Sequence, residues 1–323
     1  PPRSTLFPYT TLFRSELVKA RTRGAQADAM KRLSGALTRE LESLRRELRR
    51  LAAACALRLD YGEDEAPEDL ADELPALRKL RAAFEDLAAS YQVGRMLKEG
   101  AVVALAGRTN AGKSSLFNRF LREERAIVSD AHGTTRDYLE ADLDLGGIPV
   151  RLMDTAGLRD SVDPIEAEGV RRSLLLAEGA DAILYVVDAA AGLTAEDEEF
   201  LRDRKDALRV WNKIDLPGAR PSPPGWHAVS AKDGRGETGL ASALRLALSG
   251  AGGPEHAAAP EGIVGARLSS AAQRDAVQRS VRALKDAELA LEDGLPADAI
   301  ALDIAEALDA LGERSEEHTS ELQ

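Results

Sequence analysis

The apolar run Ala101-Val102-Val103-Ala104-Leu105-Ala106 leads directly into Gly107-Arg108-Thr109-Asn110-Ala111-Gly112-Lys113-Ser114, and this stretch decides the fold of the chain. A buried strand followed by such a glycine-rich turn is a complete phosphate-binding loop. Its backbone N–H groups surround phosphate oxygens, and the helix that begins near Lys113 directs the positive end of its dipole at the same anion. We expect Lys113 to neutralise the outer phosphates and Ser114 to bind Mg²⁺. A glycine-rich turn that binds nothing is the alternative.

The residues around this loop divide the chain into parts. From Ala101 to Ser249 short apolar strands alternate with helices, which is typical of an α/β domain with a mainly parallel sheet, and Gly146-Gly147 predicts a hairpin turn. On both sides apolar residues recur at helical spacing, and the first such stretch, from Glu16 to Cys55, predicts a long amphipathic helix. We therefore expect an all-α domain whose chain is interrupted by an inserted nucleotide-binding domain. The expected parts are a non-native-looking leader (1–15), helical domain (16–98), α/β domain (99–250), linker (251–262), helical domain (263–313) and a non-native-looking tail (314–323).

Composition limits the possible functions. The single cysteine, Cys55, excludes an internal disulfide and a cysteine-rich metal site. No apolar run is long enough to span a membrane and no secretory signal is visible, so we expect a cytoplasmic protein without a membrane partner. With a net charge of -12, any contact with nucleic acid requires a local basic patch. Between Glu16 and Arg58 there are 11 Lys and Arg against 5 Asp and Glu, which predicts either a face for RNA or a solvated helix face.

Two motifs select the base of the nucleotide. In Asn212-Lys213-Ile214-Asp215 the Asp215 carboxylate accepts hydrogen bonds from N1 and N2 of guanine, a pair that adenine cannot donate. Ser230-Ala231-Lys232 follows the last predicted strand and supplies a backbone contact to the base. Together with the phosphate-binding loop they favour GTP over ATP.

Two further motifs have the order that a GTP hydrolase needs. In Asp154-Thr155-Ala156-Gly157 we expect Asp154 to hold Mg²⁺ through water and the Gly157 N–H to sense the γ-phosphate. In Gly133-Thr134-Thr135-Arg136-Asp137 a threonine hydroxyl completes the Mg²⁺ shell while γ-phosphate is present. Leu158 stands where Ras-type enzymes carry a water-orienting glutamine, so another group must orient water; Glu166 is a candidate, and a solvated acidic loop residue is the alternative.

At this point the chain resembles the MnmE/TrmE family of tRNA-modification GTPases. The marks outside the general GTPase motifs are Lys19-Ala20-Arg21-Thr22, Leu33-Ser34-Gly35-Ala36-Leu37 and Ala126-Ile127-Val128-Ser129. The resemblance implies a Ras-like P-loop GTPase domain inserted into an all-α helical domain, a homodimer formed through the G domains, K⁺-stimulated hydrolysis, and an FAD-containing partner of the MnmG/GidA type for modification of the tRNA wobble uridine with a carboxymethylaminomethyl-type group.

The resemblance also assigns roles to residues. It implies K⁺ ligands at Asn110, Ser129, Ala131 and Thr134, Mg²⁺ ligands at Ser114, Thr135 and, through water, Asp154, a water-orienting acid at Glu166 and a second catalytic residue at Arg159. The residues expected to contact GTP or GDP are Asn110, Ala111, Gly112, Lys113, Ser114, Ser115, Ser129, Asp130, Ala131, Thr134, Thr135, Asp154, Thr155, Ala156, Gly157, Asn212, Lys213, Asp215, Ser230, Ala231 and Lys232.

The chain departs from the family at both ends. We find no counterpart of the family's folate-binding domain ahead of Glu16, and no cysteine follows Cys55 where the family ends in a Phe-Cys-Ile-Gly-Lys-like tail. We therefore expect no folate site, and a chain that hydrolyses GTP but is incomplete for tRNA modification. The alternatives are a ribosome-assembly GTPase of the Era or Der type, which lacks support because neither a KH domain nor a second phosphate-binding loop is present, and a helical scaffold switched by nucleotide.

Overall fold

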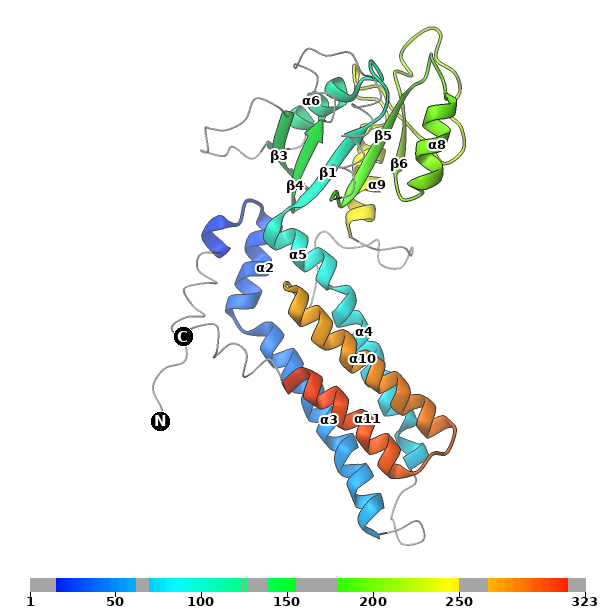
Figure 1. Ribbon diagram of the computed structural model, residues 1–323. Helices are drawn as coiled ribbons and strands as arrows, with labels where there is room; N and C mark the ends of the chain where they lie inside the picture. Colours follow the sequence, from blue (N-terminus) through cyan, green and yellow to red (C-terminus); the bar gives the residue numbers. More distant parts are fainter. Residues whose placement is uncertain are drawn as a thin grey trace. The chain divides into compact units, whose positions relative to one another are not determined.

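A computed structural model describes residues 16–61, 70–123, 125–126, 139–154, 179–249 and 267–312. These residues form two compact units (Figure 1). The helical unit comprises residues 28–61, 70–95 and 267–312, and the sheet unit comprises residues 16–27 and the described residues from 96 to 249. Because the main part of the sheet unit, from residue 96 to residue 249, lies in the chain between two segments of the helical unit, the predicted fold class, an α/β domain inserted into an all-α domain, is confirmed.

The sheet unit is built on a seven-stranded sheet in its described residues. The strands are β1 (Ala101–Ala106), β2 (Arg125–Ala126), β3 (Leu139–Leu145), β4 (Ile148–Asp154), β5 (Ala182–Asp188), β6 (Leu208–Asn212) and β7 (His227–Ala228). Their order is β2-β3-β4-β1-β5-β6-β7. The pairs from β4 to β7 are parallel, while β2, β3 and β4 pair in antiparallel fashion. The expected hairpin turn lies between β3 and β4, and both of its glycines have positive φ, 63° and 96°.

Helices cover both faces of this sheet. Successive residues of β5 point to opposite faces: Leu184 packs in the cluster that includes α6 (Lys113–Glu123) and α9 (Glu237–Leu248), and Tyr185 packs in the cluster that includes α8 (Ala195–Asp203). This is why β5 is buried almost throughout and lacks the alternation of a half-exposed strand. The register aligns Leu105 with Asp154 and Asp188 with Asn212, so that polar residues gather at the carboxyl ends of neighbouring strands.

The helical unit is a bundle in which distant parts of the chain pack together. Its long helices are α3 (Ala36–Tyr61), α4 (Leu74–Ala89), α10 (Ala271–Glu292) and α11 (Ala297–Gly312), with the short 3₁₀ turn η1 (Leu70–Glu73) ahead of α4. Helix α10 packs against α4 and α11, and α11 packs against α3 (Figure 1). Phe84, Leu48 and Leu284 are fully buried at the centre. The buried hydroxyl of Ser280 donates to the carbonyl oxygen of Ala307 at 3.0 Å, which joins α10 to α11.

The predicted long first helix is wrong in one respect, because it is broken into α2 (Arg23–Leu33) and α3. Gly35 adopts a left-handed φ of 70°, a conformation that ends a helix and that glycine accepts without strain. The helical segment ahead of β1 is likewise divided at Ser90, into α4 and α5 (Tyr91–Glu99). Leucine spacing alone predicted the buried face but not these breaks.

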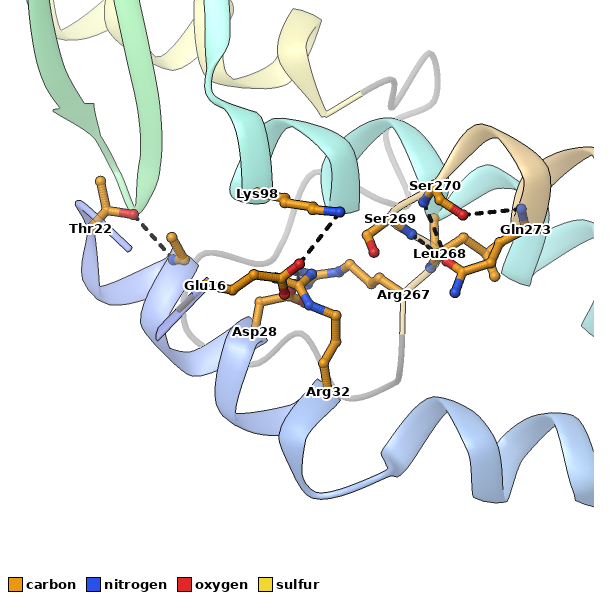
Figure 2. A network of polar contacts seen from close by, with 12 residues as sticks. Glu16, Thr22, Asp28, Arg32, Lys98, Arg267, Leu268, Ser269, Ser270 and Gln273 are labelled. Atoms are coloured by element: carbon orange, nitrogen blue, oxygen red, sulfur yellow. Dashed lines mark hydrogen bonds and ion pairs between the residues drawn. The ribbon is translucent and has the colours of Figure 1, made fainter. Parts of the chain in front are cut away.

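Helix α2 is divided between the two units, and Figure 2 labels several of the polar residues on and near it. In the sheet unit, the Thr22 hydroxyl donates to the carbonyl oxygen of Gly147 at 2.5 Å, and Lys98 pairs with Glu16 at 3.4 Å. Residues 16–27 therefore group with the sheet, although the sequence-based boundaries put them in the helical domain. In the helical unit, buried Asp28 pairs with the guanidinium groups of Arg32 and Arg267.

The start of α10 is fixed by its own side chains, also drawn in Figure 2. The Ser270 hydroxyl accepts from the Gln273 N–H at 3.2 Å, and the Gln273 side chain accepts from the Ser270 N–H, which is a complete capping box. Among the helices that the structure describes, none has the length and apolar character needed to cross a bilayer.

Candidate nucleotide-binding site

The phosphate-binding loop lies between β1 and α6, as its sequence predicts. Three of its residues have positive φ: Gly107 at 127°, Asn110 at 61° and Gly112 at 95°. A Cβ on Gly107 would lie 2.2 Å from the carbonyl oxygen of Val186, so the loop passes closely over β5. The glycines therefore allow the turn that brings the backbone N–H groups and the start of α6 to one place.

The last two residues of the loop, Lys113 and Ser114, are both held by hydrogen bonds. Lys113 is buried, and its ammonium donates to the carbonyl oxygens of Gly107 at 2.8 Å and Arg108 at 2.7 Å. This folds the lysine back over the loop. The Ser114 hydroxyl donates to Oδ2 of Asp154 at 2.7 Å, joining α6 to the end of β4. The structure thus brings together two of the three predicted Mg²⁺ ligands.

Asn212 connects the loop to the guanine-recognition segment. This buried side chain donates from Nδ2 to the carbonyl oxygen of Ala111 at 2.9 Å and accepts at Oδ1 from the Ala231 N–H at 3.1 Å. A Cβ on Gly112 would lie 2.2 Å from the same Nδ2, which explains why glycine is needed there. One asparagine therefore sets the spacing between the phosphate and base sites.

Lys213 strengthens this connection from an unusual backbone conformation. Its φ is 66°, and it and Asn110 are the two non-glycine residues with positive φ in the described parts of the chain. The Lys213 ammonium donates to the carbonyl oxygen of Asn110 and to Oδ2 of Asp188 at 2.7 Å. Burial works to raise the pKa of Asp188, but the hydrogen bonds from Lys213 and from the Ala190 N–H outweigh it and hold that pKa below its ordinary value. Asp188 was not among the predicted site residues; it is the last residue of β5.

Residues 230–235, which we call the base-recognition loop, are held together by hydrogen bonds around Ser230. The Ser230 hydroxyl donates to Oδ1 of Asp215 at 2.8 Å and accepts from the Asp233 N–H at 3.2 Å. The Ser230 N–H donates to the carbonyl oxygen of Arg235 at 2.9 Å. These bonds fix the orientation of the Asp215 carboxylate, and such preorganisation favours tight and specific binding.

A cleft of about 480 Å³ lies beside this loop, a size suited to a small-molecule ligand. Its lining includes seven of the predicted residues: Gly112, Ser115, Asn212, Lys213, Asp215, Ala231 and Lys232. Four lining residues were not predicted: Asn118, Arg119, Arg122 and Leu216. The first three continue from Ser115 along one face of α6 at spacings of three and four, so helical periodicity was the signal that would have found them.

The remaining predicted residues lie outside the described residues. These are Ser129, Asp130, Ala131, Thr134, Thr135, Thr155, Ala156, Gly157, Arg159 and Glu166.

Ser114 and Asp154 fit a magnesium ion by the chemistry of their oxygen atoms. A serine hydroxyl beside a carboxylate is a pair of hard oxygen donors, which suits Mg²⁺. Within the described ranges no group of three or more His, Cys, Asp or Glu side chains could hold a metal ion by itself. A Mg²⁺ ion at Ser114 and Asp154 would therefore take most of its ligands from phosphate and water, as Mg²⁺ commonly does.

The matching family model and the curated relatives point to the same family. Residues 15–322 match the family model described as the MnmE helical domain. The chain is 38% identical over 321 residues to a protein of Treponema denticola, covering 93% of this chain and 66% of that one. It is 40% identical over 311 residues to a protein of Synechococcus sp. strain CC9605, covering 95% and 67%. Both relatives are named tRNA modification GTPase MnmE. The chain thus spans about two thirds of the length of these curated relatives.

Solved structures also show similarity. The G domain of the FeoB iron transporter of T. maritima is 23% identical with a TM-score of 0.32, covering 46% of this chain and 98% of that one. Era of Aquifex aeolicus bound to GDP·AlF4⁻ is 23% identical with a TM-score of 0.34, covering 58% and 66%.

Proposed function

The chain belongs to the MnmE family, and from this premise we propose that its sheet unit binds GTP and hydrolyses it to GDP and phosphate. The observation that carries the proposal is the placement of Asn212 between the carbonyl of Ala111 and the N–H of Ala231. This joins a phosphate-binding loop to a base site in which Ser230 orients Asp215. A guanine nucleotide fits both parts, because its phosphates bind the loop and its base binds Asp215.

The described residues bind and orient the nucleotide. Asp215 accepts from N1 and N2 of guanine, while the loop N–H groups and Lys113 hold the phosphates. Ser114, Asp154 and, from the family pattern, Thr135 would hold Mg²⁺. When bound, this ion neutralises charge on the β- and γ-phosphates. The pairing of Ser114 with Asp154 supports this assignment, because it brings both oxygen donors to the start of α6.

The finer catalytic assignments rest on the family pattern. We propose that Glu166 orients the attacking water, with Arg159 as a second catalytic residue, and that K⁺ is held by Asn110, Ser129, Ala131 and Thr134. When bound, K⁺ offsets charge between the β- and γ-phosphates. The left-handed backbone of Asn110 supports its part in this set, since strain of this kind is found at functional sites. We further propose that two G domains pair across their nucleotides.

The names of the relatives support a cellular role in tRNA modification. We propose that GTP hydrolysis supports modification of the tRNA wobble uridine, together with tRNA and an FAD-containing protein of the MnmG/GidA type. Such an enzyme acts on tRNA, which supports a cytoplasmic location.

Base specificity tests the proposal most directly. Asp215→Asn removes an acceptor for guanine and offers an amide donor that suits the carbonyl of xanthine. We expect GTP affinity to fall at least about 100-fold while xanthosine triphosphate becomes the better ligand. Titration calorimetry with both nucleotides measures this. Unchanged GTP affinity would exclude Asp215 as the base-reading residue.

The proposed K⁺ dependence has a separate test. GTP turnover should be at least about tenfold faster in KCl than in NaCl at equal ionic strength, because Na⁺ is too small for the same ligands. Asn110→Ala should remove the difference without abolishing GTP binding. Equal slow rates in both salts would contradict the K⁺ assignment and leave GTP binding standing.

A further inference from the structure

Arg119 lies outside every nucleotide-binding motif of the chain, yet it joins the two halves of the proposed GTP site. It lies on α6 four residues beyond Ser115 and lines the same cleft as Asp215 and Lys232. Its Nε donates to Oε2 of Glu237 at 2.7 Å. Glu237 is the first residue of α9, which begins just after the base-recognition loop. This pair therefore joins the helix that carries the phosphate-binding loop to the end of the loop that reads the base.

The pair is sheltered from water. The Arg119 side chain is 23% exposed and the Glu237 side chain 12%. A charged hydrogen bond in such a place is shorter and stronger than one on an open surface. Glu237 Oε1 is itself buried and has no hydrogen-bond partner within the described residues, so the Arg119 contact at Oε2 is the one that compensates the buried carboxylate.

The base-recognition loop is shaped to receive this arginine. A Cβ on Gly234 would lie 2.3 Å from Nη2 and 2.9 Å from Cζ of Arg119, so the guanidinium packs directly against the loop backbone. Gly234 has a φ of 85°, and its N–H donates to the carbonyl oxygen of Ser230 at 2.8 Å. Ser230 in turn donates to Asp215. A short chain of contacts thus runs from Arg119 to the carboxylate that reads guanine.

We propose that Arg119, paired with Glu237, is a positioning residue that sets the distance between the base-recognition loop and α6, the helix that follows the phosphate-binding loop. Asn212 sets the same distance at the inner end of the site, between Ala111 and Ala231. Arg119 acts on the same spacing through its contacts with Glu237 and with the backbone at Gly234. The inference rests on the proposed binding of guanine nucleotide and adds a determinant of base discrimination to it.

The test compares GDP with IDP, which lacks only the N2 amine of guanine. Titration calorimetry on the full chain gives the IDP-to-GDP ratio of Kd values, which reports how well Asp215 is placed. Arg119→Gln should weaken GDP binding roughly tenfold and bring the ratio closer to one. Glu237→Gln, which changes the other partner, should act in the same direction. The double replacement Arg119→Glu with Glu237→Arg should restore part of the ratio.

Arg204→Gln is the matched control. The Arg204 side chain is 22% exposed, pairs with Asp206 at 3.1 Å, and lies at the end of α8 away from the cleft lining. It should leave the ratio unchanged. A merely structural role for Arg119 would lower thermal stability and weaken GDP and IDP equally, and that result would overturn the inference, as would GDP and IDP affinities that match the parent chain. Failure of the proposed function is distinguishable, because the unmodified chain itself would then not bind GDP.

Discussion

At the scale of single residues, the site depends on backbone conformations that few side chains accept. Asn110 and Lys213 both hold a left-handed φ, and the Lys213 ammonium bonds to the Asn110 carbonyl. Each such conformation costs roughly 1–3 kcal/mol outside glycine. The hydrogen bond between the two residues offsets part of this cost and so stabilises the left-handed conformation of both.

Gly112 offers a direct test of this loop geometry. Its φ is 95°, and an added Cβ would lie 2.2 Å from Asn212 Nδ2. Gly112→Ala should therefore displace Asn212 and weaken GDP binding about 5- to 150-fold, the equivalent of roughly 1–3 kcal/mol. Calorimetry with GDP measures the loss. Gly218→Ala is the control, because nothing lies within 4 Å of a Cβ there. If both variants bind GDP alike, the close contact has no effect on the site.

The pH dependence of the Asp188–Lys213 pair gives a second test at this scale. The pKa of Asp188 is below its ordinary value of 3.8, so the carboxylate is ionised and paired above about pH 4, and the pair is lost only as the pH falls through the lowered pKa. Asp188→Asn should weaken GDP binding several-fold. The advantage of the parent chain should stay constant from pH 8 to pH 5. An advantage that disappears within this range would show that Asp188 titrates at a higher pH.

At the scale of helices and strands, sequence patterns predicted the features that are set by neighbouring residues, such as turns. Gly146-Gly147 predicted the hairpin because a two-residue turn of this kind requires positive φ at both positions, and the structure has both. The break at Gly35 was not predicted, because the leucine spacing continues across it on both sides. The contact of Arg119 with Glu237 could not be predicted either, since the two residues are 118 positions apart and only the fold brings them together.

The bundle provides a test of packing at the same scale. Phe84 of α4 is fully buried in the cluster shared with α10 and α11. Phe84→Ala should destabilise the helical unit by about 3–5 kcal/mol, because it leaves a cavity that the neighbouring helices cannot close. Urea unfolding followed by far-UV circular dichroism measures this. Leu302→Ala on α11 is the control, since Leu302 is 70% exposed and its loss should cost no more than about 0.5 kcal/mol. Equal effects would contradict the described core.

At the scale of the whole chain, the helical unit is assembled from two segments with the sheet unit between them in sequence. Its contacts, such as Ser280 to Ala307 within one segment and Arg78 to Glu288 between the two, join residues 27 and 210 positions apart. Each unit nevertheless has its own apolar core. We therefore expect two unfolding transitions, since separate cores do not require cooperative unfolding.

Built-in probes can assign these transitions. Both tryptophans of the chain, Trp211 and Trp226, lie in the sheet unit with ring centroids 5.3 Å apart, so tryptophan fluorescence reports that unit. GDP at about 100 times its Kd should stabilise this transition by about 2.7 kcal/mol and leave the other in place. Asp28→Asn should leave the transition of the sheet unit in place and shift that of the helical unit. It removes the charge of the buried carboxylate that pairs with the guanidinium groups of Arg32 and Arg267, which should destabilise the helical unit by about 3–5 kcal/mol.

Urea titrations of the parent chain and of Asp28→Asn, each with and without GDP, give four pairs of curves to compare. The transition seen by tryptophan fluorescence should shift with GDP and not with the substitution. The transition seen only by circular dichroism should shift with the substitution and not with GDP. Arg78→Gln is a useful control for the second effect, because Arg78 pairs with Glu288 at 2.8 Å in the same unit but is half exposed, so its loss should cost little. A single transition that GDP and Asp28→Asn both shift by the same amount in both signals would mean that the two cores unfold together. In that case the insertion would have joined two cores into one cooperative structure.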